Sequence, residues 1–334
     1  MPELPEVEVV RAGLAPAVDG ARVLGAEVRD PRALKRHVPL GLDGLPGDDG
    51  LGGHGVTLTA AAGASRAADF ERRVTGLRLA APQRRGKFLW IPVVPPVPQA
   101  PPVERSAAES TPGPASSQAL LAHLGMSGQL LLRALDAPDD RHVRIRLWIE
   151  HRVHGELRLD FADQRLFGSL ALDGLVPAAG GGSVPEQAVH IARDPLDPRF
   201  DDAAFVAALR ARASGVKKLL LDQGLVSGVG NIYADEALWR ARVHPETPGR
   251  ALGPRTAREL LQRLRDVFAQ ALAEGGTSFD EQYVNVNGQA GYFAHSLNAY
   301  GRAGEPCPRC GRAIRRIVIG GRSSHFCPRC QRRR

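Results

Sequence analysis

All four cysteines of the chain lie near its end, in two copies of the sequence CPRC. Their spacing, C-x2-C-x16-C-x2-C, suits four thiolates that close a tetrahedral shell around one Zn(II). The pattern supplies a full set of four ligands, so it predicts a structural site and not a catalytic one. Two disulfides are the alternative, which we rank lower for a cytosolic chain. The predicted zinc ligands are Cys307, Cys310, Cys327 and Cys330.

The N-terminus offers a different chemistry. The residue after Met1 is small, so Met1 is normally removed and Pro2 becomes a free secondary amine. An α-amino group has a pKa of roughly 8, against about 10.4 for lysine, so more of it is unprotonated at neutral pH. Such an amine can form a cationic Schiff base with a sugar carbon. Glu3 and Glu6 could supply acid and base steps, although acids also suit an ordinary helix start.

Arginines give the end of the chain most of its charge. The formal net charge of the whole chain is +8, whereas the residues from Arg302 onward hold ten arginines and one acid, a balance of +9. The planar fork of arginine binds phosphate oxygens bidentately, so this composition favours a polyanionic partner over a merely soluble surface. Gly320 and Gly321 precede Arg322, which is consistent with a tight turn that presents this arginine.

Membrane partners are excluded at this stage. The chain has no run of eighteen apolar residues, and its first residues lack the basic start and apolar stretch of a secretory signal. We therefore expect a cytosolic protein.

The elements that must position these residues differ along the chain. A helix is expected from about Pro5 to Leu14, because proline suits the first turn and the apolar residues follow helical spacing. Residues 143–149 and 157–161 alternate between apolar and polar, which is typical of half-buried antiparallel strands with one polar face.

A glycine-rich stretch at residues 180–183 looks like a linker or hinge, and the pattern beyond it becomes helical. Asp201 or Asp202 can cap one helix. Thr256 and Glu259 form a possible capping box before another.

We therefore predict an α+β chain in three parts: a β-rich domain at residues 1–183, a helical domain at 184–303 and a zinc finger at 304–334. Two segments, at about 45–68 and 92–118, look inserted. The first is rich in glycine and alanine, and the second contains eight prolines. Such compositions bury little apolar surface, so we expect mobile surface loops.

Several sequence blocks together resemble the formamidopyrimidine-DNA glycosylases, bacterial enzymes of the Fpg/Nei superfamily. The blocks occur in the family's order and span nearly the whole chain, so they are jointly specific. They are MPELPEVE at the N-terminus, QRRGKFL (83–89), HLGMSG (123–128), DQRLFG (163–168), KKLLLDQGLVSGVGNIYADE (217–236), NGQAGYF (287–293), YGRAGEPC (300–307) and GRSSHFCPRCQ (321–331).

The resemblance implies an N-terminal β-sandwich flanked by helices and a C-terminal domain with a helix–two-turns–helix element and a zinc finger. It implies a bifunctional DNA glycosylase and AP lyase that binds double-stranded DNA and turns the damaged nucleotide out of the duplex. The substrates would be 8-oxoguanine and formamidopyrimidines, cleaved through a Schiff base and β,δ-elimination. Such an enzyme would act as a monomer at the nucleoid in the bacterial cytoplasm.

The same resemblance implies five catalytic roles. Pro2 would attack the sugar C1′, and Glu3 would protonate the sugar ring oxygen as the base leaves. Glu6 matches a further acid of less defined role. Lys87 would assist β-elimination beside a phosphate, and Arg322 would grip phosphates and assist δ-elimination.

Other residues are implied as DNA contacts. Met126 would fill the void left by the extruded nucleotide, Phe167 would wedge the stack, and Arg165 would bond the orphaned base. The alternative for Met126 and Phe167 is an ordinary place in the core. The remaining implied contacts are His142, Arg212, Lys217 and Asn231. Asn231 opens a helix whose N-terminus favours anions, and the alternative is that this residue is simply the N-cap of that helix. Residues 277–292 resemble the loop that closes on the extruded base.

Two other functions compete with this interpretation. One is an endonuclease VIII-like glycosylase for oxidised pyrimidines, whose relatives generally lack the ELPE opening and the full Met/Arg/Phe set. The other is a zinc-finger DNA-binding protein without catalysis, which would leave Pro2, Glu3 and Lys87 unexplained.

Overall fold

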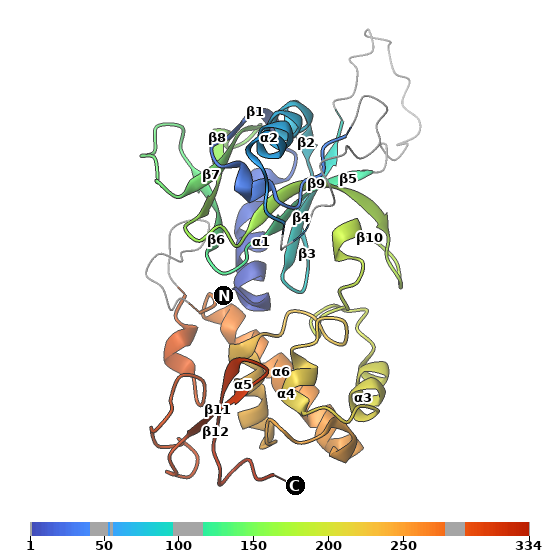
Figure 1. Cartoon of the computed structure of the whole chain (residues 1–334), viewed down its shortest axis with the longest axis vertical. Coiled ribbons are helices and arrows are strands. Elements are labelled where there is room, and N and C mark those ends of the chain that lie inside the picture. Colours follow the sequence, from blue (N-terminus) through green and yellow to red (C-terminus); the bar gives the residue numbers. More distant parts are fainter. Residues whose placement is uncertain (1, 41–52, 54–55, 96–115, 278–290, 334) are drawn as a thin grey trace.

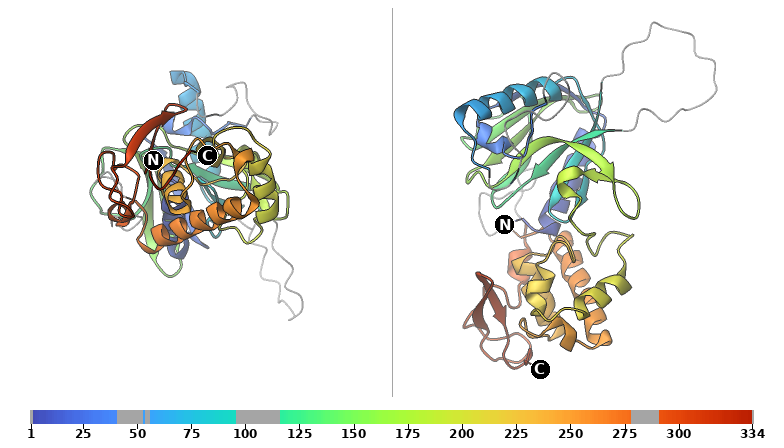
Figure 2. Two further views of the ribbon diagram at one scale, coloured as in Figure 1. Left: turned by 90° about the horizontal axis from the view of Figure 1, so that it is seen from below. Right: turned by 45° about the vertical axis from the view of Figure 1, so that its right-hand side comes forward.

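A computed structural model describes residues 2–40, 53, 56–95, 116–277 and 291–333, and it shows a sheet-bearing half joined to a helical half (Figure 1). The N-terminus lies at the junction of the two halves, and the C-terminal hairpin stands beside the helices (Figure 2). The first residues of the chain can therefore contact both halves. None of the described helices is long and apolar enough to cross a membrane.

The sheet-bearing half is an antiparallel sandwich. Its strands run in the order β10-β9-β5-β4-β2-β1-β7-β8-β6, and β3 pairs with β4. One apolar core takes residues from β9 on one side of the sheet, from β6 on the other and from α1 (Leu4–Val18). Helix α1 confirms and extends the helix predicted from Pro5 to Leu14. The strands are β1 (Arg22–Val28), β2 (Arg78–Leu79), β3 (Gln83–Arg85), β4 (Phe88–Val94), β5 (Gln118–His123), β6 (Gly128–Arg133), β7 (Val143–His151), β8 (Gly155–Asp163), β9 (Ser169–Pro177) and β10 (Ser183–Pro185). The two predicted strand segments are confirmed as β7 and β8.

The loop predicted at about 45–68 is wrong for residues 60–68, which begin helix α2 (Ala60–Val74). Thr59 caps this helix by accepting a hydrogen bond from the Ala62 N–H at 3.2 Å. Arg66 is fully buried and donates to the Lys35 carbonyl at 3.0 Å. Alanine favours a helical backbone. The buried Arg66 side chain also packs this helix against the rest of the domain, a contact that the amino-acid composition alone does not reveal.

The second predicted insertion, 92–118, is also shorter than expected. Residues 92–94 complete β4, and residue 118 begins β5. Within the rest of both predicted loops, residues 45–52, 54–55 and 96–115 lie outside the described part of the chain.

The helical half contains α3 (Asp202–Arg210), α4 (Val216–Leu220), α5 (Asn231–Ala241) and α6 (Pro254–Ala273), whose apolar faces share one core. Asp201 caps α3 by accepting from the Ala204 N–H at 2.9 Å, as predicted. The capping box predicted at Thr256 is wrong, because α6 already begins at Pro254, and proline suits a first helical turn. The short 3-10 helices are η1 (Pro31–Leu34), η2 (Glu186–Ala188), η3 (Gly249–Ala251) and η4 (Phe293–Ser296).

Residues 180–183 are not a linker, contrary to the prediction. Residues 180–182 lie in the turn that joins β9 to β10, and residue 183 begins β10. The turn is closed by a hydrogen bond from the Ala178 N–H to the Gly182 carbonyl at 2.9 Å. The predicted domain boundary after residue 183 therefore falls inside a paired hairpin, and the sheet-bearing half extends past it.

The end of the chain forms the zinc-finger hairpin, β11 (Arg315–Ile319) and β12 (Arg322–Phe326). Strand β12 packs along α5, so the finger is held against the helical half. The mixed sheet and helix architecture with a C-terminal finger is the fold class expected from the sequence.

Candidate active site and DNA-binding surface

The side chain of Glu3 closes the N-terminus of helix α5. Its carboxylate is 1% exposed and accepts hydrogen bonds from the backbone N–H groups of Gly230 at 2.7 Å and Ile232 at 3.0 Å. A Cβ at Gly230 would lie 2.2 Å from the Glu3 carboxyl carbon, so only glycine permits this approach. The sequence predicts that this helix N-terminus attracts an anion, and the anion found there is the carboxylate of Glu3 itself.

Burial changes the acidity of Glu3. Desolvation of the carboxylate raises its pKa to about 7, while the charge of Lys87 works in the opposite direction and that of Glu6 adds to the rise. A carboxyl group with a pKa near 7 holds its proton in an appreciable fraction of molecules at neutral pH. Glu3 can therefore act as a general acid there.

Glu6 ties the N-terminus to the helical half. One of its carboxylate oxygens accepts from the Glu3 N–H at 2.8 Å, and the other accepts from both the N–H and the hydroxyl of Thr277 at 2.8 Å. The hydroxyl of Tyr233 also donates to Glu6, and burial raises the pKa of this phenol well above its usual value. Glu6 thus fixes the start of the segment predicted to close on the extruded base, of which residues 278–290 lie outside the described part of the chain.

Lys87 lies near Glu3 and Glu6, in the turn between β3 and β4. A Cβ at Gly86 would lie 2.7 Å from Ser227, so this turn presses directly on the loop that precedes α5. Burial lowers the pKa of Lys87, the charge of Glu3 opposes that shift, and the charge of Arg322 adds to it. The lysine is therefore within electrostatic range of both the acid and the finger arginine. Pro2 is buried and precedes Glu3 directly, whereas Met1 lies outside the described residues.

Arg322 is exposed at the start of β12 and lines a cleft of about 620 Å³ between the finger hairpin and helix α4. Arg212 and Lys218 line the same cleft from the other side. Arg212 is paired with Asp222 at 2.6 Å, in an exposed ion pair that solvent screens. Lys218 was missed by the sequence reasoning, although the Lys-Lys doublet at 217–218 offered the signal.

The predicted DNA contact at Lys217 does not fit its position. Its side chain is fully buried, and its ammonium group lies 2.7 Å from Asp235 Oδ1 and 2.9 Å from the Ser323 carbonyl oxygen. A cation enclosed in this way cannot reach a phosphate in the cleft. Asn231 also turns inward and donates from Nδ2 to the Ser323 carbonyl at 2.9 Å. It is the first residue of α5 and not its N-cap, which is Gly230.

Met126 and Phe167 are not core residues. Their side chains are 42% and 36% exposed, which removes the alternative of ordinary packing in the sandwich. The guanidinium carbon of Arg165 lies 4.8 Å from the centre of the Phe167 ring, in cation–π contact. The structure thus presents the three residues of the predicted wedge at the surface.

A buried carboxylate that the sequence reasoning missed organises this wedge. Asp163 accepts from the Ser127 hydroxyl at 2.5 Å and from the backbone N–H groups of Arg165 at 3.1 Å and Gly168 at 2.7 Å. It joins the loop that carries Met126 to the loop that carries Phe167. The Asp163 N–H in turn donates to the carbonyl of half-buried His142 at 2.8 Å, which places the predicted contact His142 beside the same loops.

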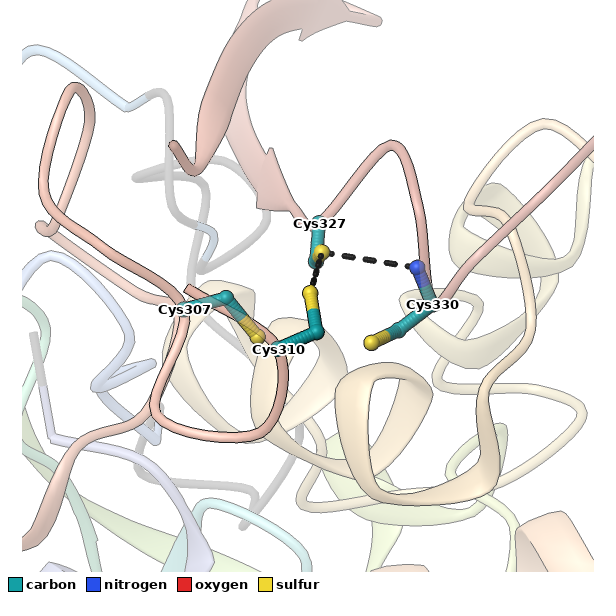
Figure 3. A group of neighbouring side chains, drawn as sticks. All are labelled: Cys307, Cys310, Cys327 and Cys330. Atoms are coloured by element: carbon teal, nitrogen blue, oxygen red, sulfur yellow. Dashed lines mark hydrogen bonds between the residues drawn. The ribbon is translucent and has the colours of Figure 1, made fainter. Parts of the chain in front are cut away.

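The four cysteines converge in the finger, from the two turns that flank the hairpin (Figure 3). Their sulfur atoms all lie within 4.8 Å of one another. Four sulfurs bound at about 2.3 Å to one ion would be about 3.8 Å apart, so the donor set and the spacing both fit tetrahedral zinc. Cys307, Cys310, Cys327 and Cys330 thus hold one structural zinc ion. The Trp239 ring N–H, 3.4 Å from Cys307 Sγ, anchors this site to α5.

Comparison with known families covers nearly the whole chain. Residues 1–48 and 54–170 match the formamidopyrimidine-DNA glycosylase N-terminal domain, and residues 191–282 match the formamidopyrimidine-DNA glycosylase H2TH domain. Residues 304–333 match the zinc finger found in FPG and IleRS.

Individual relatives and solved structures agree with these matches. A formamidopyrimidine-DNA glycosylase of Leifsonia xyli is 53% identical over 99% of this chain and 100% of its own length, and one of a Nocardioides strain is 50% identical over 99% and 94%. The crystal structure of Lactococcus lactis Fpg with abasic-site DNA superposes with a TM-score of 0.72 at 27% identity, covering 99% of this chain and 100% of that one. The MutM (Fpg) protein of Thermus thermophilus gives 0.71 at 32%, covering both chains fully.

Proposed function

The chain belongs to the formamidopyrimidine-DNA glycosylase family, and we propose that it excises 8-oxoguanine and formamidopyrimidines from double-stranded DNA through a Schiff base to Pro2. It is a DNA repair enzyme, a DNA glycosylase and AP lyase with one structural zinc. The observation that carries the proposal is the buried Glu3 carboxyl group, next to Pro2, near Lys87 and with a pKa of about 7.

In the proposed first step the unprotonated Pro2 nitrogen bonds to the sugar C1′ as the bond from C1′ to the damaged base breaks, and the base leaves with the proton that this nitrogen loses. Glu3 gives its proton to the sugar ring oxygen, the C1′–O4′ bond opens, and the Pro2 nitrogen becomes a cationic iminium. The N-terminus of α5 then stabilises the Glu3 carboxylate that remains. Glu6 holds the Glu3 backbone in place through its hydrogen bond to the N–H.

The iminium acidifies the neighbouring C2′ position, so loss of a proton there expels the 3′ phosphate in β-elimination. A second proton loss, from C4′, expels the 5′ phosphate in δ-elimination. Both leaving groups are anionic, and we assign Lys87 to the first and Arg322 to the second as the cations that stabilise them. The cleft shared by Arg212, Lys218 and Arg322 is the proposed path of the DNA backbone.

Met126, Arg165 and Phe167 are proposed to enter the duplex when the damaged nucleotide leaves it. The exposure of Met126 and Phe167 supports this role, and so does the buried Asp163 carboxylate that holds their loops together. Inserted side chains offset an unstacking cost of a few kcal/mol. His142, beside the same loops, and Asn231, at the start of α5, are proposed as further DNA contacts. We further propose that the enzyme works as a monomer on nucleoid DNA in the bacterial cytoplasm.

Base excision should depend on pH through Glu3. Because its acid form is the active one, the single-turnover rate on an 8-oxoguanine duplex should fall about tenfold for each pH unit above the Glu3 pKa of about 7. Cleavage of a preformed abasic site does not require base departure, so it should lack this alkaline limb. The measurement is a set of rate constants from pH 5 to 9 on both duplexes; identical alkaline limbs would contradict the role of Glu3.

Removal of zinc should abolish DNA binding. The finger has only a small apolar core around its cysteines, so metal binding on the order of 10 kcal/mol or more holds it together. Without the ion the hairpin loses its fold, and Arg322 loses its place in the cleft. The measurement is duplex affinity before and after chelation, with metal content determined in the same sample. Unchanged affinity in metal-free protein would refute this role of the finger.

The substrate class is tested with matched duplexes that contain 8-oxoguanine, thymine glycol or no lesion. Strand cleavage on 8-oxoguanine supports the proposal. Cleavage on thymine glycol alone would favour an endonuclease VIII-like enzyme instead. Binding to all three duplexes with cleavage of none would show a DNA-binding protein without catalysis.

A further inference from the structure

Helix α5 carries a buried ion pair that the proposed chemistry does not use. Lys217 of α4 and Asp235 of α5 are 0% and 1% exposed, and their charged atoms lie 2.7 Å apart. A buried ion pair is a weak source of stability, because desolvation offsets much of the attraction, and apolar replacements are often as stable. We therefore explain the Lys217–Asp235 pair by the other groups that it holds in place.

Both members of the pair also hold strand β12 of the finger. Asp235 accepts from the Ser324 hydroxyl at 3.0 Å and from the His325 N–H at 2.8 Å. Lys217 donates to the Ser323 carbonyl at 2.9 Å. The carboxylate and the ammonium group thus fix three consecutive residues of β12.

These three residues follow Arg322 directly. The Ser323 carbonyl also accepts from Asn231 Nδ2 at 2.9 Å, so the first residue of α5 holds the same carbonyl as Lys217. The Arg322 side chain itself is exposed in the cleft. The backbone next to Arg322 is therefore held by α4 and α5, while its side chain is exposed in the cleft.

The same helix holds Glu3. The N–H groups at the start of α5 bind the Glu3 carboxylate, and Asp235, one turn further along, binds β12. Helix α5 is thus a common frame for the acid of the first step and for the arginine of the last. The distance between these two groups is set by one rigid element.

We propose that Asp235, paired with Lys217, is a positioning residue that sets the place of Arg322 for δ-elimination. Lys217 serves in this pair and not as a DNA contact. The inference rests on the proposed lyase function and names the contacts that align its final step. The pair acts through the backbone of β12 and touches no reacting atom.

The test uses the full-length zinc-loaded enzyme and a duplex with a preformed abasic site. The measured quantity is the ratio of δ- to β-elimination products. Asp235→Asn should lower this ratio by about tenfold to a hundredfold, because a displacement of about 1 Å can cost that much in rate. Excision of 8-oxoguanine in a single turnover should change little, since Glu3 stays on α5.

Two further variants separate positioning from general damage. Glu236→Gln alters the adjacent, fully buried carboxylate of α5, which holds the backbone of Asn298, Ala299 and Tyr300 instead of β12. It should leave the product ratio unchanged. The charge-neutral double variant Lys217→Met with Asp235→Asn leaves no unpaired buried charge, and it should lower the ratio even where the single variant folds poorly.

A double-mutant cycle with Arg322→Ala completes the test. In the absence of Arg322, Asp235→Asn should add no further loss of δ-elimination. Additive losses would overturn the inference, and so would a normal product ratio in both Asp235 variants with zinc content intact. If the wild-type enzyme cleaved no abasic duplex at all, the proposed lyase function itself would fail, which is a distinct result.

Discussion

Replacement of Glu3 by glutamine should slow the excision of 8-oxoguanine by about 100- to 10,000-fold, the usual contribution of a positioned general acid. Glutamine is nearly the same size and still accepts the N–H bonds from the start of α5, so the fold should persist. It cannot give a proton to the sugar ring oxygen. A preformed abasic site has no base to lose and opens spontaneously to its aldehyde form, so its cleavage should be much less affected. The measurement is the pair of single-turnover rates on the two duplexes.

A matched control for this variant lies on α1, the helix that Glu3 precedes. Glu8 is a half-buried carboxylate on α1 that pairs with Arg11 and Arg84, away from the N-terminus of α5. Glu8→Gln should leave both rates within a few fold. Normal excision by the Glu3→Gln variant would remove Glu3 from the mechanism, whatever its pKa.

Retention of Met1 should abolish both excision and strand cleavage while leaving DNA binding intact. With Met1 in place the Pro2 nitrogen is a tertiary amide whose lone pair is delocalised, so it cannot form a Schiff base. The binding groups, including Arg212, Lys218 and Arg322, are unchanged. Protein produced with methionine aminopeptidase inhibited should bind an 8-oxoguanine duplex with normal affinity and form no covalent complex.

The same sample supplies its own control. Treatment with purified methionine aminopeptidase should restore activity in proportion to the fraction of chains that begin at Pro2, as measured by intact mass. Full activity in chains that retain Met1 would show that another residue is the nucleophile.

The sequence was most informative where chemistry restricts the residue type. The cysteine spacing predicted the finger, and the alternating strands β7 and β8 were confirmed. The polar face of those strands was read incorrectly, since Arg146 and Asp160 are buried and paired at 2.9 Å beneath the loop that follows β6. Periodicity records which residues alternate, but it does not show which loop later covers them.

The errors at the candidate site have a common cause. Lys217 looks like a phosphate contact because it is basic and precedes the glycine-rich loop, yet its partner Asp235 lies eighteen positions away. In the sequence, Asp163 is one polar residue among several where β8 ends, and only the fold brings Ser127 to it. Contacts between distant segments decide whether a charge faces DNA or the interior, and sequence spacing alone does not show them.

The central claim is that the amine of Pro2 attacks the sugar, and a mapped covalent complex tests it most directly. The enzyme is mixed with an 8-oxoguanine duplex, the Schiff base is reduced with borohydride, and the trapped complex is digested and analysed by mass spectrometry. We predict that the DNA remnant is attached to the N-terminal peptide, at the nitrogen of Pro2. A remnant on Lys87 or on any other residue, or strand cleavage without a trapped complex, would contradict the account.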